Sequence, residues 1–461
     1  MDLKAQRRRV EELDAQGTLL ERRIEDLIEE LESVRLAYSE NRLERAASIP
    51  LHTLPDDVLK LMLEAAYDHE DNGDCFELQS IVITHVSRRL RQLALSLPRL
   101  WNCLHLDTPT PLLELQLSRS GDLPLRVLLY HNKPERRDGQ SAILRDNNMI
   151  TRYVEQLGLL LRLHAHRIAH LTIDSHSARL FLSILPRLHR QPFPQAMLLE
   201  LTAERHALTV KDPYLLPECP KLDMLWLSAI PASFSNVFYE SLTYLSITDT
   251  KVLHRDLSDV ARACPNLAEL HMSSFRVVTN TSETIRFPHL ETLGLGGWSR
   301  PDIYLDWLDM PSLSDLTIFS ADLIPHRFDT RGLESLRPFP TARTVEFSRM
   351  QVSAVPLYDE NILKYVPNVT TLLLRRCPAK DGSLFEHLAT ADPPSLAALQ
   401  TLIATELEKD AQDVLLRIVQ HRARHELPLK EVQLGRGILD NMDEELLRAL
   451  GEHVAVTKFE E

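Results

Sequence analysis

Cysteine is scarce in this 461-residue chain, and its few copies follow no metal-binding or redox spacing. There are five cysteines, an odd number, and no Cys-x-x-Cys pair. Disulfide scaffolds and structural zinc sites depend on paired or clustered cysteines. We therefore expect reduced thiols, as in the cytoplasm or the nucleus, without a disulfide framework or a bound metal.

Long apolar runs and an excess of positive charge are also missing. No window approaches the ~18 uncharged apolar residues of a membrane helix, and the charged N-terminus has no apolar segment of a signal peptide. The formal net charge is −14, whereas nucleic-acid-binding domains usually have a basic balance. We interpret the short run Arg7–Arg9 as a solvated helix end and not as a nuclear signal. The sequence predicts no membrane and no nucleic-acid partner.

Motifs of catalytic and nucleotide-binding sites are absent as well. There is no GxxxxGK[ST] loop and no GxSxG turn, and the glycine-rich stretch 294–298 lies on an expected strand, where a phosphate site is not expected. His164, His166 and His170 are interpreted as loop or helix-end residues and not as metal ligands. We predict no catalytic residue, no metal and no cofactor. An enzyme with a site assembled around His164–His170 stays open as an alternative.

What the chain does have begins with a heptad pattern in residues 1–46. Apolar positions alternate at spacings of three and four, with mostly Glu and Arg between them: Val10, Leu13, Gly17, Leu20, Ile24, Leu27, Leu31, Val34 and Tyr38. This is the a/d seam of a coiled-coil helix over about four heptads. The seam would either pair two copies of the chain or form one helix that packs on its own chain, and the homodimer is the less favoured of the two.

Residues 47–106 are expected to form a small helical domain. In "LPDDVLKLML", Pro55 suits the first turn of a helix, and Asp56 and Asp57 lie near the positive end of the helix dipole. A second run with helical spacing ends at Pro98. Three short helices leave little room for a core of their own, so the domain is expected to complete its packing on a neighbour or a partner.

The two halves of this segment resemble an F-box. "LPDDVLKLML" is similar to its Leu-Pro-acidic-acidic-aliphatic opening, and "VSRRLRQLALSLPRLW" is similar to its later Arg-rich stretch. A heptad helix just upstream resembles the arrangement in many fungal F-box proteins. The family commonly has Cys where Ser87 stands and Trp where Leu90 stands. The resemblance implies binding to a Skp-family adaptor, and through it to a cullin, by these residues: Leu54, Pro55, Val58, Leu59, Leu97, Pro98, Leu100 and Trp101.

From residue 166 to 461 the pattern apolar-x-x-apolar-x-apolar recurs. Its starts are Ile168, Ala196, Leu222, Leu242, Leu267, Leu290, Leu313, Ala342, Val369, Leu396 and Leu429. Most starts are about 20–29 residues apart, the period of leucine-rich repeats. Cys219-Pro220 and Cys264-Pro265 resemble the "CPxL" form of the repeats in F-box proteins, and we interpret these cysteines as small buried residues.

These repeats predict an α/β fold, an irregular horseshoe-shaped solenoid with short parallel strands. The last two apolar positions of each motif are expected to face inward, and neighbouring repeats complete each other's core. Residues 254–264 are expected to be a helix on the convex side, and residues 231–241 an irregular loop. The connecting region 107–165 is expected to supply a helix and a strand that cap the solenoid.

The residue between the two inward positions is expected to point outward on the concave face. Down the stack these residues are Thr172, Glu200, Trp226, Ser246, His271, Gly294, Thr317, Glu346 and Leu373. We take Trp226, His271 and Glu346 as candidate substrate-binding residues. Trp226 would either anchor a partner or be covered by a neighbouring segment. The stretch 297–310, with Trp298, Tyr304 and Trp307, is interpreted as a local hydrophobic plug, with a recognition loop as the alternative.

The resemblance and the repeats together predict the substrate-recognition subunit of a Skp–cullin–F-box type ubiquitin ligase. It would bind the adaptor through the F-box and an unidentified protein substrate through the repeats, without catalysis of its own. The alternative is a leucine-rich-repeat scaffold with a degenerate F-box and no ligase role, motivated by Leu90.

Overall fold

The structure is a computed structural model of the chain. It describes residues 22–38 apart from 25 and 36, 54–68, 79–131, 139–204, 213–278 apart from 236, 274 and 275, 283–296, 308–319, 339–348, 363, 366–376, 384–406 apart from 393, and 412–459. The chain divides into two compact units, Met1–Trp101 and Asn102–Glu461.

The first unit begins with a helix over the described residues of 22–38. The seam side chains in this stretch are all exposed, from 48% for Leu27 to 71% for Tyr38. The earlier seam positions Val10, Leu13 and Gly17, like Leu20, lie outside the described residues. Whether the seam pairs two copies of the chain therefore stays a prediction.

The described residues 54–68 and 79–101 of this unit are mostly helical. It contains α3 (Asp56–Asp68), α4 (Gln79–Val86), α5 (Arg88–Leu95) and the 3-10 turn η2 (Pro98–Trp101). A small core joins Leu59 of α3 to Leu90 and Leu93 of α5, with Leu54, Leu63 and Ile83 packed against it.

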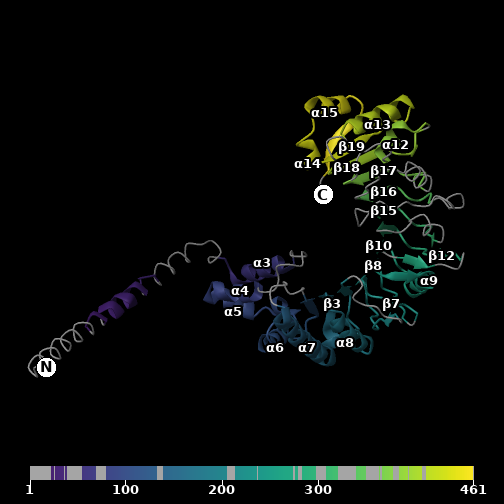
Figure 1. Cartoon of the computed structure of the whole chain (residues 1–461). Helices are drawn as coiled ribbons and strands as arrows, with labels where there is room; N and C mark the ends of the chain where they lie inside the picture. Colours follow the sequence, from purple (N-terminus) through teal and green to yellow (C-terminus); the bar gives the residue numbers. More distant parts are fainter. Residues whose placement is uncertain are drawn as a thin grey trace, which may run out of the picture. The chain divides into compact units, whose positions relative to one another are not determined.

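The second unit is built on one parallel sheet. In its described part the strands pair in the order β1-β2-β3-β4-β6-β8-β10-β13-β15-β16-β17-β18-β19-β20. Their bounds are β1 (Cys103–His105), β2 (Leu125–His131), β3 (Ile168–Ser175), β4 (Leu198–Ala203), β6 (Met224–Ser228), β8 (Tyr244–Thr248), β10 (Glu269–Ser273), β13 (Thr292–Gly296), β15 (Asp315–Phe319), β16 (Thr344–Ser348), β17 (Thr371–Arg375), β18 (Thr401–Thr405), β19 (Glu431–Gly435) and β20 (Ala455–Phe459). Successive strands follow one another along the unit (Figure 1). The fold is therefore mixed α/β with a large parallel sheet, consistent with the predicted solenoid-like arrangement.

Short elements and helices connect these strands. Three two-stranded pairs lie beside the main sheet: β5 (Tyr214–Leu215) with β7 (Ala232–Ser233), β9 (Lys251–Leu253) with β11 (Arg276–Val278), and β12 (Ile285–Arg286) with β14 (Leu308–Asp309). The helices are α6 (Thr110–Arg119), α7 (Gly139–His164), η3 (Ala165–Arg167), α8 (Ala178–His189), α9 (His254–Ala263), α12 (Leu384–Thr390), α13 (Gln412–Arg424), α14 (Arg436–Leu439) and α15 (Glu444–Gly451). Apolar side chains of α8, α9, α12 and α13 pack with those of the strands in one continuous core.

The repeat pattern predicts these strands because it places two apolar side chains on one face. The inward positions are buried throughout, as in β6, where Leu225 is 0% and Leu227 is 2% exposed. Every predicted motif from Ile168 to Leu429 leads into a parallel strand, and with two exceptions the strand begins two residues after the motif start. The predicted helix at 254–264 is α9.

One predicted start is wrong by three residues. The pattern was placed at Leu396, but β18 begins at Thr401, and its inward residues are Leu402 and Ala404. The backbone N–H of Leu399 donates to the carbonyl of Leu396 at 2.9 Å, so Leu396 forms the turn before the strand. Cys219 holds the same position before β6. The motif therefore begins at Leu399.

The region 102–165 is the start of the same sheet. β1 lies within the range 47–106 that was predicted to be helical, but it pairs with β2, and β2 pairs with β3. The predicted helix and strand of the connecting region are α6 and β2. Side-chain bonds fix this region: Gln156 donates to Thr110 Oγ1 at 3.2 Å, and the buried Arg167 donates to Ser120 Oγ at 2.9 Å and to the carbonyl of Leu123. The described residues of the connecting region are therefore an integral part of the second unit.

Candidate interaction surfaces

An arginine of α5 holds the start of α3. Arg89 Nε donates to Asp56 Oδ1 at 2.8 Å, and Arg89 Nη2 donates to the same oxygen and to the carbonyl of Leu54, both at 2.5 Å. The Asp56 side chain is 60% exposed, so the pair adds at most about 1 kcal/mol to stability. Its geometric effect is larger, because it brings together two sequence motifs that lie 33 residues apart.

The two positions that depart from the F-box pattern have local structural roles. Ser87 is the N-cap of α5, and its Oγ accepts the N–H of Leu90 at 3.1 Å. Serine is among the best residues for this role. Leu90 is 6% exposed and packs with Leu59 and Leu93. Both residues therefore fit the folded helical unit.

An apolar strip of α3 faces solvent. It consists of Pro55, which directly precedes α3, and of Val58, Leu61 and Met62, which follow on the same side at spacings of three and four. Val58, Leu61 and Met62 are 36%, 65% and 46% exposed. A surface helix normally turns its apolar side toward a core. We call these four residues the α3 strip, and they are the apolar surface that α3 offers to a partner.

The eight predicted adaptor contacts divide between surface and interior. Pro55, Val58 and Pro98 are exposed, and Leu54 is half-buried. The four buried residues are Leu59, Leu97, Leu100 and Trp101. The indole N–H of Trp101 donates to the carbonyl of Ala94 at 2.8 Å, which gives this residue a structural role in the chain itself. The adaptor contacts stay predictions. Fewer of the eight residues are exposed, and thus accessible to an adaptor, than the sequence motif contains.

Leu61 and Met62 are not among the predicted adaptor contacts, because the resemblance singled out only the first residues of the α3 motif. Met62, four residues after Val58, belongs to the apolar helical pattern of this stretch, and Leu61 follows Val58 by three residues. Figure 1 shows α3 beside α4 and α5 in the first unit.

The sheet of the second unit has one face in the core and one open face. Residues that alternate with the buried positions lie on the open face, and most are half-buried. The predicted outward residues are paired in register from strand to strand, from Thr172 beside Glu200 to Glu346 beside Leu373. They therefore form one continuous row across the sheet.

Three aromatic rings meet on this face. The centroid of the Trp226 ring lies 5.6 Å from that of Tyr244, and Tyr244 stacks on His271 at 5.2 Å. We call these three residues the aromatic row. A carboxylate flanks it on each side: Glu200 is the register neighbour of Trp226, and Glu269 Oε2 lies 3.8 Å from His271 Nε2.

Glycine in β13 makes room for the end of this row. A Cβ atom at Gly294 would lie 2.2 Å from His271 Nδ1, and one at Gly296 would lie 2.1 Å from the Phe319 ring. Side chains of β10 and β15 thus lie over the bare backbone of β13. The glycine-rich stretch that drew attention in the sequence has this packing role.

Burial shifts the titration of the groups in and beside the row. Burial raises the pKa of Glu200 above its ordinary value, and the charge of Asp174 raises it further. The pKa of Asp174 is also raised, mainly by burial. Burial lowers the pKa of His271, against the opposing effect of Glu269. At neutral pH the imidazole is therefore uncharged.

Of the three predicted substrate residues, the structure brings two together. Trp226 and His271 are joined through Tyr244, which is not among the predicted residues. Glu346 lies on β16, separated from β10 by β13 and β15, and its Oε1 lies 3.5 Å from Arg375 Nε. Trp298, Tyr304 and Trp307 lie outside the described residues.

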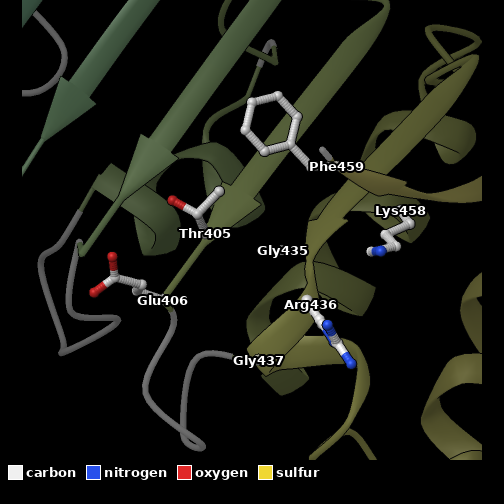
Figure 2. A pocket seen from close by; sticks show the side chains of 7 residues that line it. All are labelled: Thr405, Glu406, Gly435, Arg436, Gly437, Lys458 and Phe459. Atoms are coloured by element: carbon white, nitrogen blue, oxygen red, sulfur yellow. The ribbon is translucent and has the colours of Figure 1, made fainter. Parts of the chain in front are cut away.

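A pocket of about 450 Å³ lies at the C-terminal end of the sheet. Figure 2 shows Glu406 on one side and Arg436 and Lys458 on the other, with Gly435 between them. Glu406 pairs with Arg376, and Arg436, 80% exposed, lies 3.7 Å from Asp440. The charged groups are exposed and of both signs, so the pocket has no constellation that selects one ligand.

The histidines and cysteines considered as metal ligands or nucleophiles do not form a common site among the described residues. Within the described ranges, no three His, Cys, Asp or Glu side chains are placed to hold a metal ion. His164 ends α7, His166 lies in η3 and His170 lies on β3. Burial raises the pKa of both Cys219 and Cys264 to about 12, which makes them poor nucleophiles.

The fold and these surfaces define a mixed α/β protein that has a parallel sheet with an open aromatic face and a separate small helical unit. No known protein-family pattern matches the chain, and no curated protein matches it. None of the helices in the described part is long and apolar enough to cross a membrane.

Proposed function

We propose that this chain is the substrate-recognition subunit of a Skp–cullin–F-box type ubiquitin ligase. The helical unit binds a Skp-family adaptor, and through it a cullin, while the open face of the sheet binds a protein substrate. The chain performs no chemical step. It raises the effective concentration of a substrate lysine near a charged ubiquitin-conjugating enzyme, which is enough to accelerate transfer.

The observation that carries the proposal is the joining of two sequence motifs. Arg89 of the second motif bonds to Asp56 and to the carbonyl of Leu54 in the first. The pair fixes the start of α3, and the α3 strip beyond it stays exposed. An exposed apolar strip on a very small helical unit is expected where a second protein completes the packing.

A scaffold with a degenerate F-box is the second candidate, because Leu90 replaces a family tryptophan. The structure supplies a reason to favour the first candidate. Leu90 is buried beside Leu59 and Leu93, and Ser87 caps α5. The departures from the family pattern therefore leave the helical unit intact and do not reach the α3 strip.

Direct binding of the purified full chain to a Skp-family adaptor tests the proposal. We expect Leu61→Asp to weaken binding about tenfold or more, since it places a charge in a desolvated apolar contact. Leu61 is 65% exposed, so the change leaves the small core in place. Leu182→Asp on α8 is the matched control, because Leu182 is an exposed leucine, 53% accessible, of the other unit.

Binding by the wild type and by Leu182→Asp, lost in Leu61→Asp, supports the proposal, and recruitment of a cullin to the complex would complete it. No binding by the wild type would instead favour the scaffold. Equal loss in both variants would show that the measurement reports surface charge and not a contact of α3.

A further inference from the structure

The open face carries an unbalanced charge. On the described strands β2–β19 its carboxylates are Asp174, Glu200, Glu269, Asp315, Glu346 and Glu431, and its arginines are Arg126 and Arg375. The whole chain is acidic too, with a formal net charge of −14. A face of one sign attracts a partner of the opposite sign and repels others.

The aromatic row is the apolar part of this acidic face. Trp and Tyr rings attract a Lys or Arg side chain over their faces. Glu200 and Glu269 stand on either side of the row, so a cation there would also meet a carboxylate. The neutral His271 adds no repulsion.

The dimensions fit an extended peptide. From β4, which carries Glu200, to β10, which carries His271, the sheet advances by three strand spacings, about 14 Å at about 4.8 Å each. An extended chain of four or five residues covers about this length. One Lys or Arg side chain on the rings and a second basic residue near a flanking carboxylate would lie within such a segment.

We infer that the aromatic row and its flanking carboxylates bind an extended basic segment of a protein partner, with a Lys or Arg side chain over the rings of Trp226 and Tyr244. The identification of that partner as a substrate rests on the proposed function. The inference that the bound segment is basic does not depend on it. Charge complementarity selects this occupant over an acidic or phosphorylated peptide, which Glu200 and Glu269 beside the row would repel.

Fluorescence anisotropy with the full chain tests the inference. The probe is a fluorescein-labelled octapeptide of alternating lysine and glycine, and the reference peptide has glutamine in place of each lysine. We expect the lysine peptide to bind about tenfold more tightly or better. Glu200→Gln and Trp226→Leu should each weaken it about threefold or more, since each removes one of the two attractions.

Glu431→Gln is the matched control, because Glu431 lies on the same face but on β19, far along the sheet from the row. It should leave the affinity unchanged within about 1.5-fold. Equal weakening by Glu200→Gln and Glu431→Gln would overturn the inference, because binding would then follow net charge alone. Equal affinity for the lysine and glutamine peptides, or tighter binding of an acidic peptide, would overturn it as well.

The test uses two variants of the site, Glu200→Gln and Trp226→Leu, so it can still be decided if one of them unfolds. Glu200→Gln conserves size and an acceptor for the hydroxyl of Thr172, which now donates to Glu200 Oε2 at 3.2 Å. Thermal melting checks each variant. The assay contains no adaptor, so peptide binding without adaptor binding would remove the ligase proposal and keep this inference, and the reverse outcome would do the opposite.

Discussion

The titration of His271 and Glu200 gives the proposed binding of a basic segment a pH dependence with a definite sign. Burial holds the pKa of His271 below its ordinary value, so the ring is neutral at pH 7 and becomes a cation only on acidification. The pKa of Glu200 is raised, so its charge is lost at a higher pH than for an exposed glutamate. Protonation of His271 repels a cationic side chain, and protonation of Glu200 removes the charge that attracts it. As pH falls, both changes therefore lower the affinity for a basic segment.

We therefore expect the affinity for the lysine peptide to fall about threefold or more between about pH 7.5 and about pH 5. The groups that face His271 are Glu269 on its own strand and Tyr244 on β8, with Gly294 on β13. In His271→Phe, which cannot titrate, the fall should be shallower. Affinity that is flat, or that rises on acidification, would contradict the placement of the cation on this row.

At the scale of an element, one buried arginine fastens α13 to the turn before β18. Arg422 is 1% exposed, and it donates to the carbonyls of Ser395 at 2.9 Å, Leu396 at 3.1 Å and Leu399 at 3.2 Å. Arg422→Met would remove the side-chain donor from all three carbonyls, of which that of Leu396 would keep the N–H of Leu399. We expect the free energy of unfolding to fall by about 2–4 kcal/mol.

Urea denaturation followed by circular dichroism measures this loss. Arg424→Met is the control, since Arg424 is exposed and lies two residues further along the same helix. It should change stability by less than about 0.5 kcal/mol. If the two variants lose the same amount, the three carbonyl bonds do not hold α13 in place.

The strands could be predicted from sequence, because each repeat contains the pattern that defines its own strand. Two apolar residues separated by one residue face the core, as Leu225 and Leu227 do. The start of β18 was misplaced although the sequence contains the signal. The pattern is imperfect from Leu396, because Thr401 takes its last apolar position, whereas Leu399, Leu402 and Ala404 satisfy it in full. The pairing with β17, where Thr371 lies beside Thr401, agrees with the start at Leu399.

The residues of the aromatic row were predictable only where the alternation within a single strand identifies them. Trp226 and His271 follow from alternation within their own strands. Tyr244 precedes the predicted outward residue of β8 by two positions, and its place in the aromatic row depends on diagonal contacts with neighbouring strands. The bond between Arg89 and Asp56 spans 33 residues and has no local signature.

At the scale of the whole chain, the two compact units have very different cores. Among the described residues of the helical unit, Leu59, Leu90 and Leu93 form a small cluster, and Ala94, Leu97, Leu100 and Trp101 are also buried, whereas the core of the second unit runs without interruption along its sheet. A three-helix segment of this size buries too little apolar surface to be stable by a wide margin. It should therefore open more often than the sheet does.

Hydrogen exchange measures this difference directly. In the free chain we expect amides of α3–α5 to exchange faster than those of β6, β8 and β10. A Skp-family adaptor at 100 times its dissociation constant should stabilise the unit it binds by about 2.7 kcal/mol, which slows exchange there about 100-fold. The strands should be unaffected. Equal protection of both units in the free chain would show that the small core opens only with the sheet, and slowing confined to the strands would move the adaptor site away from α3.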